Sequence, residues 1–212
     1  MFKGLNLFVR ETINCPYCYI GKRHLELALE QFPHKNEVQI VWKSFELDPE
    51  TQPNINISHT QMLAEKYGKD LAWVKMMDEK LTQMASKVGL EFHMDKVIPA
   101  NTFNAHRLLK LAKSRNLEEQ MYTKLFSAKF TEGQDIGSTT ILKKIGNEVG
   151  LDLNELEEFF RNNFFEREVR RDEELAGVIG INSVPFFIFD KEIAFSGAQP
   201  IEVFLDVLEK RN

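Results

Sequence analysis

Asn14–Lys22, NCPYCYIGK, contains both cysteines of the chain. Cys15 and Cys18 are separated only by Pro16 and Tyr17, so they form a CxxC motif. In a reducing compartment, a lone cysteine pair is more often catalytic or metal-binding than a structural disulfide. The segments on either side of the motif then indicate which kind of domain carries it.

The motif lies between segments of different periodicity. Leu5–Val9 (LNLFV) alternates like a strand, and Tyr19–Phe32 is rich in helix formers. Val38–Leu47 (VQIVWKSFEL) returns to β-branched and aromatic residues. The order strand, CxxC, helix, strand predicts an α/β domain in which the motif opens the helix.

A helical block follows, from about Ser58 to Phe160, with apolar residues at three- and four-residue steps. The mixture of strands and helices seen at the start of the chain then returns. It consists of two predicted strands joined at Asp190–Lys191 and a closing helix over Ile201–Lys210. We therefore predict one discontinuous α/β domain, residues 1–57 and 161–212. An all-helical domain, residues 58–160, is inserted after its second strand.

Composition and charge exclude several classes of function. The 212 residues are 43% hydrophobic and carry a net charge of −5, with no sustained basic tract, so we expect a globular protein and no nucleic-acid partner. The charged run Glu166–Glu174 (EREVRRDEE) is typical of a solvated helix face with ion pairs. No run of eighteen apolar residues occurs, so we expect no membrane segment and a cytoplasmic location.

The position of the cysteines predicts their chemistry. A CxxC at a helix start places the sulfur of Cys15 among unsatisfied backbone N–H groups, at the positive end of the helix dipole. These groups favour the thiolate, so we expect Cys15 to be the nucleophile. Pro16 suits the first helical position, because its missing N–H is not needed there. Cys18, one turn deeper, is the expected resolving cysteine.

Two other readings of the motif are weaker. A structural zinc site needs about four ligands, and the five histidines show no H-x₃₋₅-H pair, so we predict no metal site. A CxxC that serves packing alone is uncommon at a helix start, where the cysteine pKa is lowered. Pro185 stands directly before an apolar strand. On its own, this position is only a weak sign of a cis bond, because a small share of X-Pro bonds is cis.

Taken together, these segments resemble the thioredoxin superfamily. The motifs CPYCYIGK, VWKSFELDP, ANTFNAHRLLKLA, KLFSAKFTEGQDI and SVPFFIFD…FSGAQP are similar, in order and spacing, to the DsbA family and to its cytoplasmic, FrnE-like branch. The resemblance implies a thioredoxin fold with an inserted helical domain. It also implies that the Val184–Pro185 bond is cis and packs beside the active-site cysteines, with Pro16 and Tyr17 as supporting residues.

The chain departs from the family pattern in three places. Family members commonly have Asp three positions before the first cysteine, where this chain has Thr12, with Glu11 one position further back. Asn14 replaces a small or apolar residue. Between the cysteines, Tyr17 stands where periplasmic DsbA proteins have histidine. Since a neutral tyrosine cannot stabilise a thiolate as a cationic histidine does, we expect a less oxidising disulfide.

Asn101 and His106 are softer candidates for a substrate pocket. They stand near the start of a predicted helix, in a region that contributes to the substrate pocket of related glutathione-dependent isomerases. The alternative is that Asn101 caps the helix and His106 is a surface or packed residue.

Two classes of enzyme remain open. The favoured one is a thiol-disulfide oxidoreductase that acts on disulfide-containing proteins or small thiols, with no bound cofactor and with glutathione as a candidate co-substrate. The other resembles kappa-class glutathione transferases and 2-hydroxychromene-2-carboxylate isomerases. Those relatives typically have serine at the nucleophile position, so the presence of both Cys15 and Cys18 favours the first class. The sequence is compatible with a homodimer.

Overall fold

The computed structural model describes residues 4–51 and 57–210, in two compact units. One unit comprises residues 1–45 and 172–212, and the other residues 46–171. The expected domain boundaries, 57/58 and 160/161, both fall inside the second unit. The expected ranges also include residues 1–3, 52–56 and 211–212, which lie outside the described residues. That the helical part is a separate domain stays a prediction.

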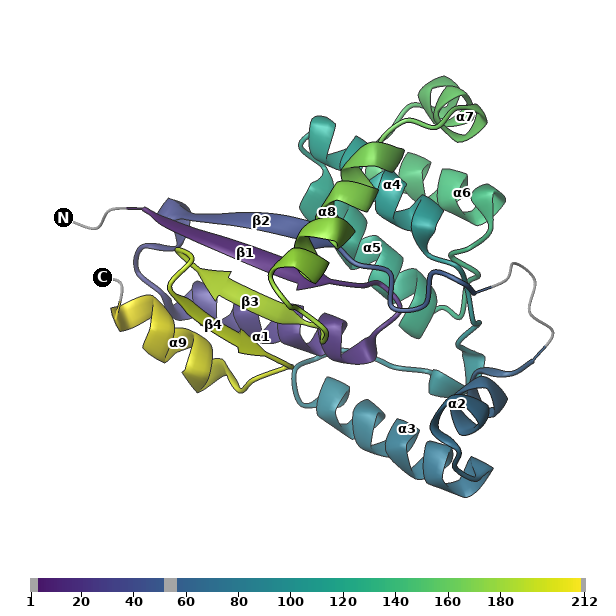
Figure 1. Ribbon diagram of the computed structural model, residues 1–212, viewed down its shortest axis with the longest axis horizontal. Helices are drawn as coiled ribbons and strands as arrows, with labels where there is room; N and C mark the ends of the chain where they lie inside the picture. Colours follow the sequence, from purple (N-terminus) through teal and green to yellow (C-terminus); the bar gives the residue numbers. More distant parts are fainter. Residues whose placement is uncertain (1–3, 52–56, 211–212) are drawn as a thin grey trace. The chain divides into compact units, whose positions relative to one another are not determined.

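The first unit is a four-stranded sheet with helices, shown by its labels in Figure 1. Its strands follow the order β2-β1-β3-β4, with β1 parallel to β2, antiparallel to β3, and β3 antiparallel to β4. The α/β prediction is thereby confirmed. Its elements are β1 (Leu5–Glu11), α1 (Pro16–Gln31), a 3₁₀ turn (Lys35–Glu37), β2 (Val38–Ser44), β3 (Phe186–Phe189), β4 (Ile193–Ser196) and α9 (Ile201–Lys210).

Alternation along the strands separates the two faces of this sheet. Leu7 and Val9 of β1 are fully buried and lie opposite Phe189 and Phe187 of β3. Phe187 also meets Phe204 of α9 edge to face, with ring centroids 4.9 Å apart. The buried face is therefore the one that α1 and α9 cover, and burial of these large side chains is the main stabilising term of the unit.

The second unit is helical, as expected. Apart from a 3₁₀ turn at Met94–Lys96, its elements are α2 (His59–Tyr67), α3 (Leu71–Ser86), α4 (Phe103–Ser114), α5 (Glu118–Phe130), α6 (Thr139–Val149), α7 (Leu153–Arg161) and the start of α8 (Glu166–Val178). Ser58 and Gln61 form a capping box that begins α2. Gly150 ends α6 in the left-handed conformation at φ 111°, which glycine adopts without steric cost.

The charged run in α8 is less solvated than the sequence indicates. Asp172 is 4% exposed; its carboxylate accepts hydrogen bonds from Lys43 Nζ at 2.8 Å and from the Ser44 backbone at 3.1 Å. Arg10 donates to the Asp172 carbonyl. The prediction of a solvated helix face is therefore wrong at Asp172, because long-range partners in β1 and β2 compensate its burial.

Lys129 of α5 is a second charged residue that the fold buries. Its side chain is 1% exposed, and Nζ donates a hydrogen bond to the Ile98 carbonyl at 2.8 Å. Burial lowers the pKa of Lys129 to about 8, and the negative charge of Asp135 opposes this only in part. The folded protein therefore holds this proton less tightly than the unfolded chain does.

Replacing Lys129 by methionine should remove the pH-dependent free-energy cost of burying its positive charge. Because the folded pKa is lowered, the unfolded chain binds more protons between about pH 8 and 10.5, so Lys129 destabilises the fold most at neutral pH and least at high pH. The difference in unfolding free energy between Lys129→Met and wild type should shift in favour of wild type by about 3 kcal/mol from pH 7 to pH 10.5. Urea titrations across this range measure it.

Lys124, on the same helix, provides the control. Its pKa is raised, because the hydrogen bonds and charges of Glu148 and Glu132 outweigh partial burial. Its ion pairs are present at every pH below that raised pKa. The difference in unfolding free energy between Lys124→Met and wild type should therefore stay nearly constant up to about pH 10. If the difference in unfolding free energy between Lys129→Met and wild type were equally constant with pH, the lowered pKa of Lys129 would be contradicted.

Helix α1 approaches the loop before β3 very closely at Gly21. A Cβ placed on Gly21 would lie 3.0 Å from Cγ of Pro185, 3.4 Å from Cζ of Phe187 and 3.5 Å from Cα of Ala198. These atoms belong to the proline ring, to a buried residue of β3 and to the backbone just after β4, so they have little room to move. Glycine in the middle of this helix is therefore explained by close packing.

Adding a methyl group at this position should destabilise the protein. Gly21→Ala should lower the unfolding free energy by about 1–3 kcal/mol, despite the better helix propensity of alanine. The matched control is Gly177→Ala in α8, where no atom lies within 4 Å of the added Cβ, and it should raise stability by up to about 1 kcal/mol. Similar stabilisation by both variants, in chemical denaturation, would show that α1 does not contact Pro185 this closely.

Candidate active site

A short turn carries the chain from β1 into α1 and fixes where the first cysteine lies. The Cys15 backbone N–H donates a hydrogen bond to the Thr12 carbonyl at 3.3 Å, and the Asn14 backbone donates to Thr12 Oγ1 at 3.4 Å. Ile13 and Thr12 are fully buried within this turn. Cys15 is therefore held at the end of a central strand, at the residue that begins the helix.

Cys15 occupies the N-cap of α1, with Pro16 at the first helical position. The side chain of Cys18 donates a hydrogen bond to the Cys15 sulfur, and this is the largest cause of a lowered Cys15 pKa. Burial opposes the shift, while the backbone N–H groups of Cys18 and Tyr17 add to it. The negative charge on the Cys15 sulfur is thus stabilised by donors at the start of the helix.

Cys18 has the opposite character. It is fully buried, whereas Cys15 is 9% exposed. Burial, the hydrogen bond to Cys15 and the negative charges of Cys15 and Glu11 raise the pKa of Cys18 well above its usual value, and a backbone hydrogen bond from Thr12 opposes them. Two cysteines three positions apart therefore differ in both access and acidity.

Glu11 and Thr12, where the chain departs from the family pattern, both lie beside the second cysteine. Glu11 is fully buried at the end of β1, and its charge contributes to the raised pKa of Cys18. Thr12 shapes the turn through both its carbonyl and its side-chain hydroxyl, which accept hydrogen bonds from the backbones of Cys15 and Asn14. The negative charge near Cys18 therefore comes from the position before Thr12, and sequence spacing alone could not establish this.

The proline loop also belongs to the first unit and contacts the same helix. The Val184–Pro185 bond is cis, and Gly197 donates a hydrogen bond to the Pro185 carbonyl at 2.8 Å. The close approach of Pro185 to Gly21, three residues after Cys18, places this loop against the second turn of α1. Val184, just before it, is half-buried.

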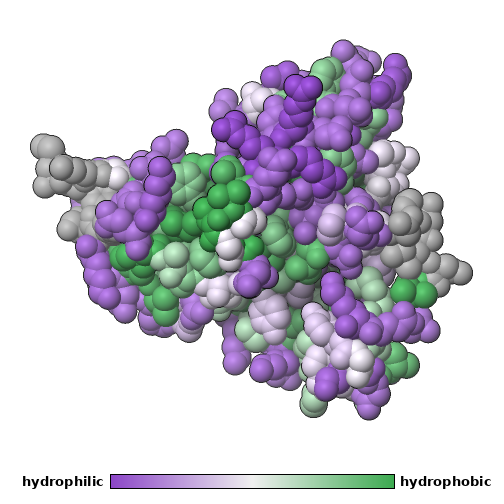
Figure 2. Space-filling view, in the orientation of Figure 1, coloured by the Kyte–Doolittle hydropathy of each residue, from purple (hydrophilic) through white to green (hydrophobic). Residues whose placement is uncertain are grey.

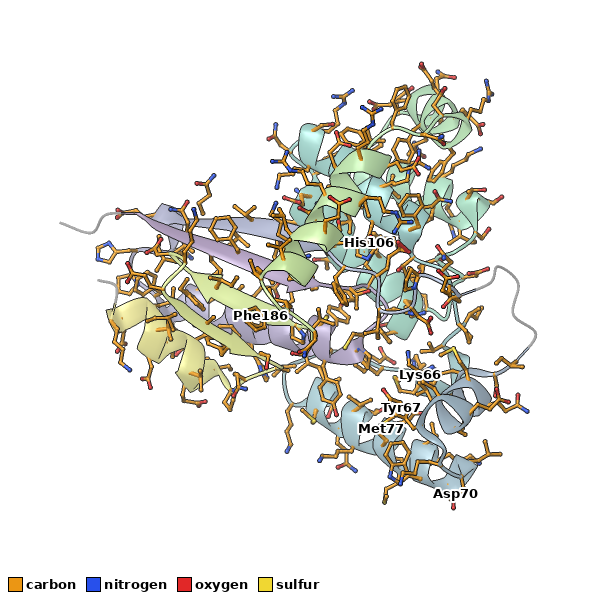
Figure 3. The ribbon with its side chains drawn as sticks, viewed as in Figure 1. Lys66, Tyr67, Asp70, Met77, His106 and Phe186 are labelled. Carbon is orange, nitrogen blue, oxygen red and sulfur yellow. The ribbon has the colours of Figure 1, made fainter. Side chains whose placement is uncertain are left out.

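Asn101 and His106 lie in the second unit and make mainly structural contacts. Asn101 Oδ1 accepts a hydrogen bond from the Phe103 backbone at 3.0 Å, and Nδ2 donates to the carbonyls of Pro49 and Thr51. Asn101 is therefore not the N-cap of α4, which is Thr102, but it lies one residue before it and ties the start of the helix to the segment after β2. His106 is fully buried in α4 (labelled in Figure 3).

Sequence reasoning missed Lys22, the buried cation of α1. Lys22 is 1% exposed, pairs with Glu26 one turn later, and lies 5.9 Å from the centre of the Trp42 ring. The only sequence signal for its burial was that this lysine stands on an otherwise uncharged face of the predicted helix.

Within the described residues, no group of three His, Cys, Asp or Glu side chains could hold a metal ion. None of the described helices has both the length and the apolar composition that a membrane span requires.

Known proteins share both the sequence and the fold. Residues 12–209 match the model of the DSBA-like thioredoxin domain. A probable DsbA oxidoreductase from Streptomyces coelicolor is 32% identical, with a TM-score of 0.93 over 98% of this chain and 89% of that one. An uncharacterised Bacillus subtilis protein, YwbO, is 32% identical over 65% of this chain, and the match spans 62% of that relative's length.

Two more distant structures share the fold alone. A 2-hydroxychromene-2-carboxylate isomerase is 15% identical, with a TM-score of 0.73 over 97% of this chain and 95% of that one. The cytosolic disulfide reductase DsbM from Pseudomonas aeruginosa is also 15% identical, with a TM-score of 0.65 over 97% and 98%, and another structure of DsbM contains GSH. The prediction of a thioredoxin fold with helices inserted after the second strand is thus confirmed, and the chain belongs to the family of DSBA-like thioredoxin domains.

Proposed function

We propose that this protein is a thiol-disulfide oxidoreductase in which Cys15 is the nucleophile and Cys18 the resolving cysteine. The observation that carries the proposal is the opposite shift of the two pKa values within one turn of α1. A lowered pKa increases the share of Cys15 that is thiolate, the form that attacks a disulfide, whereas the raised pKa of the buried Cys18 keeps this thiol protonated. Pro16, Tyr17, Val184 and Pro185 are the proposed supporting residues.

The reaction then follows in two balanced steps. The Cys15 thiolate attacks one sulfur of a substrate disulfide, which forms a mixed disulfide and releases the other sulfur as a thiolate. Cys15 then carries no charge, so one cause of the raised Cys18 pKa disappears. Once Cys18 has lost its proton, its thiolate attacks the Cys15 sulfur. The products are the Cys15–Cys18 disulfide, one substrate thiol that accounts for the Cys18 proton, and one substrate thiolate that solvent can protonate; the reverse sequence oxidises a dithiol.

The setting of this chemistry is part of the same proposal. We propose substrates among disulfide-containing proteins or small thiols, with glutathione as co-substrate rather than bound cofactor. The structure of DsbM with GSH supports this choice. We further propose that the protein acts in the cytoplasm, where a lone CxxC pair is typically catalytic. Homodimer formation, and a substrate-binding role for Asn101 or His106, stay predictions.

A glutathione-dependent isomerase or transferase is the alternative. The shared fold with an isomerase keeps it open, but fold alone does not assign function. The two proposals differ over Cys18, because an isomerase that binds glutathione needs no resolving thiol. If Cys18→Ala left the natural turnover unchanged, the alternative would be favoured.

Removing the nucleophile should abolish disulfide reduction. Cys15→Ser should lower the rate of insulin reduction on the order of a thousandfold or more, because a serine hydroxyl is not ionised at neutral pH and no third thiol exists in the chain. Cys18→Ser is the matched control: it should also lose turnover but should keep rapid alkylation of Cys15 by iodoacetamide. Substantial insulin reduction by Cys15→Ser would refute the assigned nucleophile.

Removing the resolving thiol should trap an intermediate and change the acidity of Cys15. With oxidised glutathione, Cys18→Ala should accumulate one glutathionyl adduct on Cys15, detected by intact-mass spectrometry, while wild type should not. Because the Cys18 side chain is the largest cause of the lowered Cys15 pKa, the variant's alkylation rate should also rise at a higher pH than in wild type. An unchanged pH midpoint would mean that backbone donors alone set the Cys15 pKa.

A further inference from the structure

The first unit contains an apolar cavity on the sheet face that α1 and α9 leave uncovered. Its volume is about 650 Å³, and neither cysteine lines it. The walls include Leu175, Ile179 and Ile181, at and just after the end of α8. Figure 2 shows a hydrophobic surface where Figure 1 labels β1, β3 and the C-terminal end of α8. A cavity of this size and character is typical of small-molecule sites.

Strand register gives the cavity floor two distinct rows. Phe8 of β1 lies opposite Ile188 of β3, which lies opposite Ala194 of β4, so this row is apolar. The second row lies two positions further along the strands. There Arg10 of β1 is opposite Phe186 of β3 on one side and Lys43 of β2 on the other. Figure 3 labels Phe186 on the sheet. The floor is therefore apolar in its middle and cationic at one end.

The charges around this cavity are unequal. Its lining holds three cations, Arg10, Lys43 and Lys191, and no Asp or Glu among the described residues. Asp172 pairs with Lys43, and the negative charges of Asp172 and Glu173 also act on Arg10, whereas Lys191 has no acidic partner within the described part of the chain. The remaining positive charge attracts an anion rather than a cation.

Arg10 carries an unmet hydrogen bond. The residue is 5% exposed, and one terminal nitrogen donates to the carbonyls of Ser44 and Asp172. Its Nε–H is buried and has no hydrogen-bond partner among the described residues. A buried charged group with an unsatisfied donor is costly, so an acceptor brought into the cavity would be bound favourably.

We propose that this cavity binds a small anionic amphiphile, a carboxylate on an apolar body of about ten carbons. The carboxylate accepts a hydrogen bond from Arg10 Nε–H, and the apolar body lies along Phe8 and Ile188 against Ile179. Lys191, near the other end, adds positive potential at the entrance. This site is independent of the thiol chemistry, because α1 lies on the opposite face of the sheet.

Decanoate and decyltrimethylammonium, two probes with the same chain length and opposite charge, test the proposal in calorimetric titrations of the full chain. Decanoate should bind with a Kd of roughly 0.1 mM, judged from the affinity per atom that small ligands reach. Decyltrimethylammonium should bind at least tenfold more weakly. Equal affinities would show that the cavity attracts apolar chains without regard to charge and would overturn the proposal.

Variants locate the site. Ala194→Trp, at an exposed position of the edge strand, should fill the cavity and weaken decanoate at least tenfold. Val178→Trp, an exposed position of α8 that does not line the cavity, should leave the Kd unchanged. Arg10→Lys keeps the charge without Nε–H and should weaken decanoate but not decyltrimethylammonium. Undiminished decanoate affinity in Ala194→Trp would overturn the proposal, even if Arg10→Lys failed to fold.

Discussion

The parallel pairing of β1 with β2 is the constraint on which the rest of this protein depends. Parallel neighbours cannot be joined by a tight turn, so the chain must cross over the sheet between them, and α1 makes that crossing. A crossover helix begins where the preceding strand ends. Cys15 is therefore located just after the C-terminal end of a central strand, at the helix terminus that carries unsatisfied N–H donors.

The same crossover makes two identical side chains chemically different. Cys15, at the cap, retains a little exposure and receives hydrogen bonds, whereas Cys18 lies one turn inside and has Glu11 in its surroundings. Placing a negative charge on the outer sulfur makes ionisation of the inner sulfur harder still. The asymmetry that thiol-disulfide exchange requires thus arises from helix geometry and burial, with no metal needed to create it.

Local patterns in the sequence predict most of this architecture. The alternation in Leu5–Val9, the CxxC spacing and the turn at Asp190–Lys191 reflect interactions between near neighbours, and the structure has a strand, a helix start and a hairpin there. Asp172 and Lys129 could not be predicted as buried, because their partners lie far away in the sequence. The same holds for Glu11, whose effect on Cys18 depends on the strand-to-helix turn.

The discontinuous sheet also has a consequence for biosynthesis. β1 lies between β2 and β3, yet residues 45–185 separate these two partner strands along the chain. At usual rates of translation, that stretch takes on the order of 10 s to synthesise. During this interval one edge of β1 has no partner, and an unpaired apolar strand is prone to aggregation. The nascent chain is thus a natural client for chaperones on the ribosome until β3 has emerged.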